Sequence, residues 1–117
     1  MDDTFLQYAE IGANYLEARI DTYGGHPSGV DVTATGIALL AHYNNSRIPL
    51  ANELGGIIWD FYINHTTNLS IHAINNDGTP ADYTSYLEGQ ARNIFRFLHL
   101  YQATGNETHL ELSLIHI

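Results

Sequence analysis

The feature that most constrains this chain is an alternation between two kinds of predicted helix. Residues 4–20 and 47–63 place apolar residues on one face and acidic or amide residues on the other, a pattern typical of amphipathic helices that face water. Residues 32–43 and 86–104 are apolar on most faces, which indicates helices buried on most sides. We therefore predict an all-α fold in which outer and inner helices alternate as successive helical hairpins.

An internal repeat supports this alternation. The segment that begins at residue 3 aligns without gaps with the segment that begins at residue 46, which is 43 residues later, and the alignment matches Gly12 with Gly55. A third copy begins at residue 106. Gly55 and Gly56 lie in the middle of a predicted helix, where each glycine costs about 1 kcal/mol relative to alanine. We expect a neighbouring helix to pack very closely against this pair.

The first predicted helix has a defined apolar stripe, and polar residues mark where the helices begin. The stripe comprises Phe5, Ala9, Gly12, Leu16 and Ile20, with Glu10, Asn14 and Glu17 outside it. The expected helix N-caps are Asp31 or Thr33, Ser46, Ser85 with Glu88 in a capping box, and Asn106. Gly105 is expected to end the helix before Asn106. In the long connection that follows residue 63, "NLSIHAI" predicts a short strand and "NNDG" predicts a tight turn around Asp77.

The charge of the chain limits its partners. The formal net charge is −9, from 13 acidic and 4 basic residues. A nucleic-acid-binding surface needs clustered Lys and Arg, so the composition argues against a nucleic-acid partner. The apolar runs are shorter than a membrane span requires, so we expect no membrane span. Four N-x-[ST] sequons, which begin at Asn44, Asn64, Asn68 and Asn106, favour an extracytoplasmic or cell-surface location.

The sequence contains no motif for a metal or a cofactor. There is no cysteine, which excludes disulfides and thiolate metal ligands. The seven histidines show no HExxH motif and no paired ligand spacing, and there is no phosphate-binding loop. We therefore predict neither a metal nor a cofactor.

Two stretches resemble a known family. The segments "YLEGQARNIFRFLHLYQATGNETHLE" and "VDVTATGIALLAHYNNSRIPLANELG" resemble helical hairpins of the (α/α) toroids of the six-hairpin glycosidase-like superfamily. Members include glucuronyl C5-epimerases, acylglucosamine epimerases and unsaturated-uronide hydrolases. The resemblance covers nearly the whole chain up to Glu111 and matches no diagnostic catalytic motif of any one member. It implies a partial (α/α) toroid and an epimerase, hydrolase or lyase that acts on a poly- or oligosaccharide, with uronate-containing chains among the candidates.

The last six residues, "LSLIHI", resemble the translation of a mosaic-end adapter used in transposon-based DNA library preparation. We therefore expect residues 1–111 to be a fragment of one toroid domain and residues 112–117 to be a non-native tail, the alternative being a genuine apolar helix segment. A fragment would be inactive on its own. It would also leave the apolar face of its last helix uncovered, which predicts self-association through that helix.

The resemblance implies that a sugar site lies where the connections 21–32 and 64–85 gather, and these are also the longest and most polar loops. Carboxylates supply acid–base chemistry, aromatic rings stack on sugar faces, and arginine binds carboxylates. The candidate catalytic residues are Glu88, His72 and Asp82. The candidate substrate-binding residues are Tyr83, Tyr86, Arg92, His26 and Tyr23.

Each candidate also has a purely structural interpretation. Asp31 is interpreted as a helix cap, Asp77 as a turn residue and Glu88 as part of the capping box. Arg92, four residues after Glu88, can pair with it on one helix face. The alternative function is a non-catalytic helical-repeat interaction module of a surface glycoprotein, which the four sequons and the absence of a catalytic motif favour.

Overall fold

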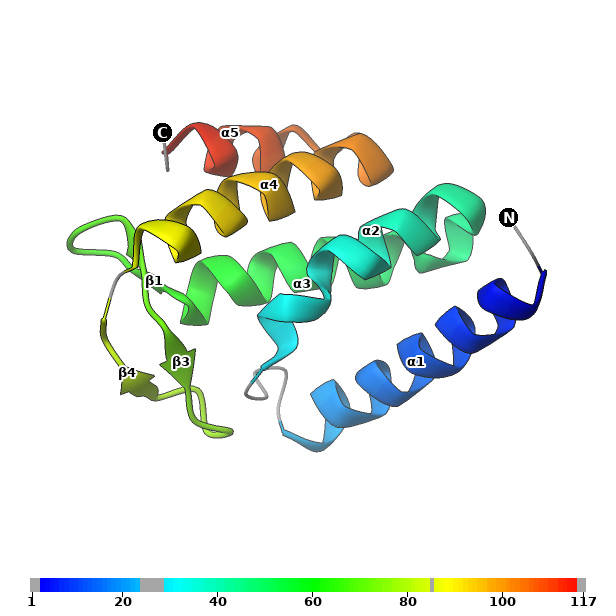
Figure 1. The fold of residues 1–117 in the computed structure, drawn as a ribbon, viewed down its shortest axis with the longest axis horizontal. Helices are drawn as coiled ribbons and strands as arrows, with labels where there is room; N and C mark the ends of the chain where they lie inside the picture. Colours follow the sequence, from blue (N-terminus) through cyan, green and yellow to red (C-terminus); the bar gives the residue numbers. More distant parts are fainter. Residues whose placement is uncertain (1–2, 24–28, 85, 116–117) are drawn as a thin grey trace.

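The computed structural model describes residues 3–23, 29–84 and 86–115, which form a mainly helical protein (Figure 1). Every predicted helix is present, and the bounds of the first four lie within two residues of their predicted positions. The prediction of a mainly helical fold is therefore confirmed. The helices are α1 Asp3–Thr22, α2 Ala34–Tyr43, α3 Ile48–Phe61, α4 Leu87–Thr104 and α5 Glu107–Ile115, with 3-10 turns η1 Val30–Thr33 and η2 Asn45–Arg47 leading into α2 and α3.

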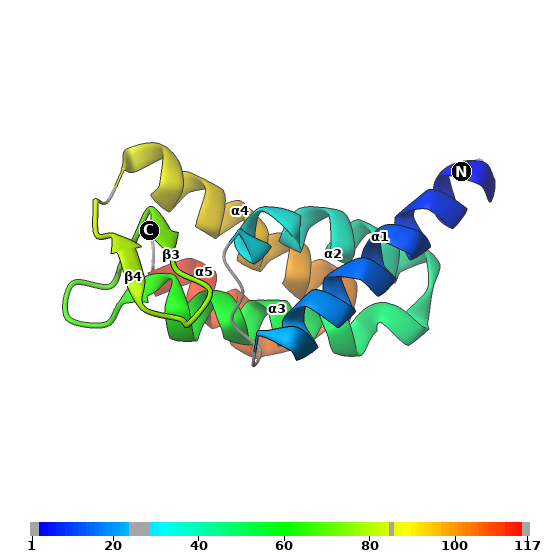
Figure 2. The same cartoon turned by 90° about the horizontal axis from the view of Figure 1, so that it is seen from below.

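The core lies between α2, α3 and α4. Leu54 and Ile58 of α3 and Phe97 and Leu100 of α4 are completely buried. Helix α5 packs along α4, whereas α1 lies along one side of the molecule, away from α4 and α5 (Figures 1 and 2).

The observed burial agrees with the predicted outer helix at α3 and differs from the predicted inner helix at α4. Helix α3 buries Leu54 and Ile58 and leaves Glu53 and Asp60 exposed, as predicted for a helix with one face toward water. Helix α4, expected to be buried on most sides, leaves Phe95 62% exposed and Leu87 86% exposed. The reason is that Arg92, Arg96 and His99 interrupt the apolar residues of α4, so that only one face of this helix can be buried.

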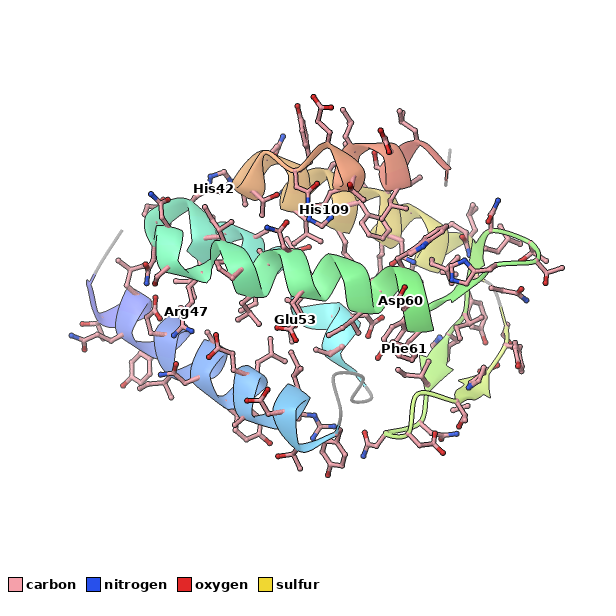
Figure 3. All side chains as sticks on the ribbon, turned by 180° about the vertical axis from the view of Figure 1, so that it is seen from behind. His42, Arg47, Glu53, Asp60, Phe61 and His109 are labelled. Atoms are coloured by element: carbon pink, nitrogen blue, oxygen red, sulfur yellow. The ribbon has the colours of Figure 1, made fainter. Side chains whose placement is uncertain are left out.

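Gly55 is the position where two helices come closest. A Cβ atom added to Gly55 would overlap the imidazole ring of His109 on α5, which confirms the close packing predicted at this glycine (Figure 3). His109 Nε2 lies 2.8 Å from Asn52 Oδ1, and Asn106 Nδ2 donates to the same oxygen at 3.1 Å. Gly56 has open space around its Cβ position, so the prediction is wrong for this second glycine.

The helix ends confirm some predicted caps and correct others. Gly105 ends α4 with φ of 70°, and Asn106 Oδ1 accepts from the Thr108 N–H at 3.1 Å, as predicted. Asn44, not Ser46, caps η2, because its Oδ1 accepts from the Ser46 N–H at 3.1 Å.

The caps predicted at the start of α2 are not made. Thr33 lies at the start of α2 without a capping bond, and the carboxylate of Asp31 is instead paired with Arg96. The N-cap of α4 is Tyr86, whose side chain makes no capping bond, and Ser85 lies outside the described residues.

The connection between α3 and α4 forms two small antiparallel sheets. Strand β1, Ile63–Asn64, pairs with β2, Leu69–Ser70, and β3, Ala73–Ile74, pairs with β4, Pro80–Asp82. The strand predicted in "NLSIHAI" is therefore present as two short strands. Asp77 Oδ1 accepts from the Thr79 N–H at 2.9 Å, which confirms its role in the turn. The side chain of Gln90 accepts from the Ser70 N–H at 2.9 Å and so fixes β2 against α4.

Helix α1 is rotated relative to its predicted stripe. Ala13, Leu16 and Ile20 are buried, whereas Ala9 and Gly12 are exposed. The polar residues predicted to lie outside the stripe do lie off the buried face, and they also bind Arg47, which donates to Glu10 Oε2 at 2.7 Å, to Glu17 Oε1 at 2.9 Å and to Asn14 Oδ1 at 2.8 Å (Figure 3). The Arg47 side chain is only 11% exposed, so a charge buried to this extent requires counter-charges from α1.

Candidate functional site

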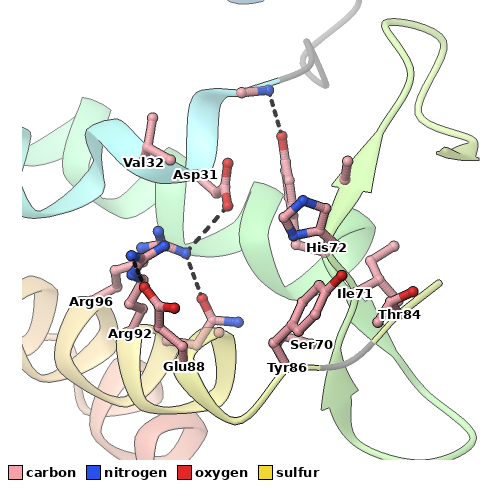
Figure 4. Close-up of a pocket in the computed structure, with 15 residues that line it drawn as sticks. Asp31, Val32, Ser70, Ile71, His72, Thr84, Tyr86, Glu88, Arg92 and Arg96 are labelled. Carbon is pink, nitrogen blue, oxygen red and sulfur yellow. Dashed lines mark hydrogen bonds and ion pairs between the residues drawn. The ribbon is translucent and has the colours of Figure 1, made fainter. Parts of the chain in front are cut away.

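A pocket of about 260 Å³ lies where η1, the β2–β3 segment and the first turns of α4 meet (Figure 4). Asp31 and Val32 line it from η1, and residues 70–73 line it from the β2–β3 segment. Because η1 follows the first long connection and β2–β3 belong to the second, the structure brings parts of both predicted loops together.

The ion pair between Arg96 and Asp31 joins η1 to α4 beneath the pocket. Arg96 Nη1 lies 3.2 Å from Asp31 Oδ2, and the two side chains are only 12% and 15% exposed. The same nitrogen donates to Oδ1 of the buried Asn93 at 2.9 Å. Because it is largely buried and its charge is paired with Asp31, Arg96 is suited to holding the two elements in place rather than to binding a ligand.

A second ion pair lies at the mouth of the pocket. Arg92 and Glu88 pair one turn apart on α4, as the spacing predicts, and their side chains are 60% and 69% exposed. Exposed pairs of this kind contribute little to stability because water screens the attraction. The guanidinium of Arg92 can therefore exchange Glu88 for an anionic ligand at small cost.

Two aromatic rings form one wall of the pocket. His72 and Tyr86 meet edge to face, with ring centroids 5.1 Å apart and an interplanar angle of 76° (Figure 4). The Tyr86 side chain is half exposed, which leaves part of this wall accessible.

Tyr62 supports the pocket from behind. Its hydroxyl oxygen accepts from the Gly29 N–H at 2.9 Å, and the residue is only 2% exposed. Burial raises the pKa of Tyr62 to about 12, with the charge of Asp31 as a further cause. The phenol is therefore neutral at ordinary pH and anchors the start of η1.

The predicted site residues divide into three groups. Those that line the pocket are His72, Tyr86, Glu88 and Arg92. Those that lie elsewhere are Asp82, Tyr83 and Tyr23. His26 lies outside the described residues.

The residues that lie outside the pocket have structural contacts or exposed positions. Asp82 Oδ1 accepts from the Thr84 N–H at 2.9 Å. Hydrogen bonds from the Thr84 side chain and backbone keep the pKa of Asp82 below its usual value, so Asp82 is suited to a turn rather than to donating a proton. The Arg19 guanidinium lies over the ring of Tyr23, 5.4 Å from its centroid, and Tyr83 is 65% exposed.

Sequence reasoning missed Arg96, Asn93 and Tyr62. A signal for Arg96 is present, because Glu88, Arg92 and Arg96 are spaced by four residues and so lie on one helix face. Asn93 and Tyr62 have no such signal, since nothing in the local pattern distinguishes them from ordinary core residues.

Across residues 3–23, 29–84 and 86–115, no group of three or more His, Cys, Asp or Glu side chains is arranged to hold a metal ion. In the same part of the chain, no helix has the length and apolar character needed to cross a membrane. Comparisons of the chain with protein-family models, with curated proteins and with solved structures found no match.

Proposed function

We propose that this chain carries a binding pocket for an acidic sugar and belongs to a carbohydrate-active enzyme that acts on a poly- or oligosaccharide. The observation that carries the proposal is the placement of the exposed Arg92 guanidinium beside the His72–Tyr86 aromatic wall in one pocket. Arginine binds a carboxylate through two parallel hydrogen bonds, and an aromatic face packs against the C–H groups of a pyranose ring. A uronate residue offers both chemical groups.

The charge distribution supports an anionic ligand. Two of the four arginines in a chain of net charge −9 line this one pocket. Arg96 is held by Asp31 and Asn93, whereas Arg92 is paired with the solvent-exposed Glu88. Arg92 is therefore the residue that we expect to contact the ligand.

The pocket favours binding over catalysis by this chain alone. Glycoside hydrolysis uses two carboxyl groups, one on each side of the scissile bond. The carboxylates that line the pocket in the described residues are Asp31 and Glu88, and each is paired with an arginine. We expect the purified chain to bind an oligouronate without turning it over, and robust turnover would contradict this. The reaction class, epimerase, hydrolase or lyase, stays open.

The test compares two neighbouring tyrosines, using nuclear magnetic resonance titration with an oligouronate. Tyr86 lines the pocket and Tyr83 does not, and both are at least half exposed, so replacing either by alanine leaves the core intact. Tyr86→Ala should weaken binding by about tenfold or more, because it removes one packing contact between an aromatic ring and the sugar. Tyr83→Ala should bind as the unmodified chain does.

The alternative is a non-catalytic helical-repeat interaction module. The observation in its favour is that α1 exposes apolar residues on the side facing away from the core. If Tyr86→Ala and Tyr83→Ala both leave oligouronate binding unchanged, or if no binding occurs, the interaction module becomes the better account.

A further inference from the structure

Helix α1 carries a second apolar stripe on the side that faces away from the protein. Tyr8, Ile11 and Tyr15 are 69%, 63% and 67% exposed. Exposed small residues extend this stripe toward both ends of α1 at spacings of three and four residues. One outward stripe therefore runs the length of the helix. In order, the stripe is Thr4, Tyr8, Ile11, Tyr15, Ala18 and Thr22.

The spacing of this stripe is a heptad pattern. The intervals of four, three, four, three and four residues place its members at the a and d positions that form the seam between paired helices. Ala13 and Ile20, which are buried against the core, fall at the f positions directly opposite. Helix α1 therefore has one apolar face toward its own protein and a second one toward solvent, where an ordinary surface helix would be polar.

The residues on and beside the outward stripe allow a second copy of the chain to pack there without facing like charges. Two copies of a chain with net charge −9 repel each other, so a contact surface between them has to be free of facing like charges. None of the six stripe residues is charged. At the flanking g positions are Gln7, Asn14 and Asp21, and at two of the e positions are Gly12 and Arg19. In an antiparallel pair g faces g and e faces e, so Gln7 meets Asp21, Asn14 meets Asn14 and Gly12 meets Gly12, without a like-charge contact.

We propose that the outward stripe of α1 is a self-association surface, on which a second copy of this chain packs its own α1 in antiparallel orientation. Such a two-fold pairing avoids setting one tyrosine against another across the seam. It places Tyr8 opposite Ala18 and Ile11 opposite Tyr15, with Thr4 opposite Thr22 at the ends. In a parallel pairing each residue would face the same residue of the second copy, so tyrosine would face tyrosine and each small residue would face an identical small residue.

This surface differs from the one that the sequence suggested. Self-association was predicted through the last helix, and the described part of α5 exposes Leu114 as its single large apolar side chain while Leu112 and Ser113 are buried. Helix α1 offers three such side chains in one line.

Sedimentation equilibrium of the full chain tests the association. We expect a concentration-dependent dimer that becomes tighter as salt rises, because salt screens the repulsion between the two acidic bodies. Tyr15→Glu places a charge in the seam and should raise the dissociation constant by about tenfold or more. Tyr43→Glu is the matched control, because Tyr43 is an exposed tyrosine on α2 and the substitution adds the same charge outside the stripe.

Cysteine pairing tests the orientation. The chain has no cysteine, so any disulfide that forms must involve the introduced cysteine. When chains with Ile11→Cys and chains with Tyr15→Cys are mixed and oxidised, the antiparallel arrangement predicts disulfides mainly between the two different chains. Disulfides mainly between identical chains would overturn it. A chain that stays monomeric at every concentration, or a dimer that Tyr15→Glu and Tyr43→Glu affect equally, would overturn the α1 surface itself.

Discussion

Arg96 on α4 and Asp31 in η1 are 65 residues apart in sequence, and their side chains form a 3.2 Å ion pair that is largely shielded from water. This pair holds the first long connection against the helix that carries Arg92. The shape of the pocket therefore depends on a contact that is remote from the residues expected to bind a ligand. The stability of the pair can be tested separately from any binding.

Asp31→Ala should destabilise the protein by roughly 1–3 kcal/mol, because it leaves the charge of Arg96 largely buried without its partner. Glu88→Ala removes the equivalent partner of the exposed Arg92 and should cost less than about 0.5 kcal/mol. Urea unfolding of both variants measures the difference. Equal losses would mean that burial of the Arg96–Asp31 pair has no energetic consequence.

The two neighbouring glycines of α3 should respond in opposite directions to alanine. Gly55→Ala forces a methyl group into the ring of His109 and should destabilise the protein by roughly 1–3 kcal/mol. Gly56→Ala meets nothing within 4 Å and should stabilise it by about 0.4–1 kcal/mol, since alanine restricts the unfolded chain and favours a helix. Thermal unfolding of the two variants gives both signs. A stabilised Gly55→Ala would show that α5 does not pack as described.

His109 should make the protein sensitive to acid. Burial lowers the pKa of His109 below its ordinary value of 6.5, and its Nδ1 has no hydrogen-bond partner among the residues that the structure describes. Between the folded and unfolded pKa values the unfolded chain binds the proton and the folded chain does not, so stability falls as pH falls below about 6.5. Above that pH the histidine contributes no dependence.

Urea unfolding across this pH range, with His109→Gln and with the exposed His99→Gln as a control, measures the effect of the imidazole. The slope of stability against pH should flatten in His109→Gln and persist in His99→Gln. A slope that persists unchanged in His109→Gln would assign the acid sensitivity to other groups.

Tyr62 should make the protein sensitive to alkali. Its folded pKa is about 12, compared with an ordinary value of 10.0, so the unfolded chain loses the phenolic proton first and stability falls as pH rises between these values. Tyr62→Phe should remove this loss and cost about 1 kcal/mol at neutral pH, because the Gly29 N–H then lacks its acceptor. The exposed Tyr43→Phe should change neither quantity. Unfolding curves at neutral and alkaline pH decide between these outcomes.

Local signals in the sequence predicted the helices and several of their details. Gly105 and Asn106 marked the boundary between α4 and α5, Asp77 marked a turn, and Gly55 indicated a close helix contact. Each of these features depends on residues close together in the chain, or on a steric requirement that only one residue type meets. Such features can be read from a single sequence.

Contacts between distant segments could not be predicted in the same way. Glu10 was placed on the water-facing side of its helix, and the sequence did not show that its carboxylate accepts hydrogen bonds from Asn44 and from Arg47, which together keep the pKa of Glu10 below its usual value. Asp31 was interpreted as a cap, but it pairs with Arg96. Both outcomes depend on the angle at which one helix packs on another, which the local pattern does not encode.

The candidate site, like the fold, could be predicted from the sequence only in part. The long connections and the start of α4 were predicted to carry the site, and His72, Tyr86, Glu88 and Arg92 do line one pocket. Asp82 and Tyr83 belong to the same polar segment but lie outside it, because β4 pairs with β3 and the Asp82 carboxylate accepts from Thr84. Composition identified the correct segment, and only the strand pairing determines which of its side chains reach the pocket.

The most direct test of the acidic-sugar pocket is the affinity ratio between an oligouronate and a neutral oligosaccharide of the same length, measured by calorimetry. We compare the unmodified chain with Arg92→Gln and with Arg19→Gln, which makes the same charge change away from the pocket. The account predicts that the unmodified chain and Arg19→Gln prefer the oligouronate by about tenfold or more, and that Arg92→Gln loses this preference. Equal affinity for the acidic and neutral sugars, or a preference that survives in Arg92→Gln, would contradict it.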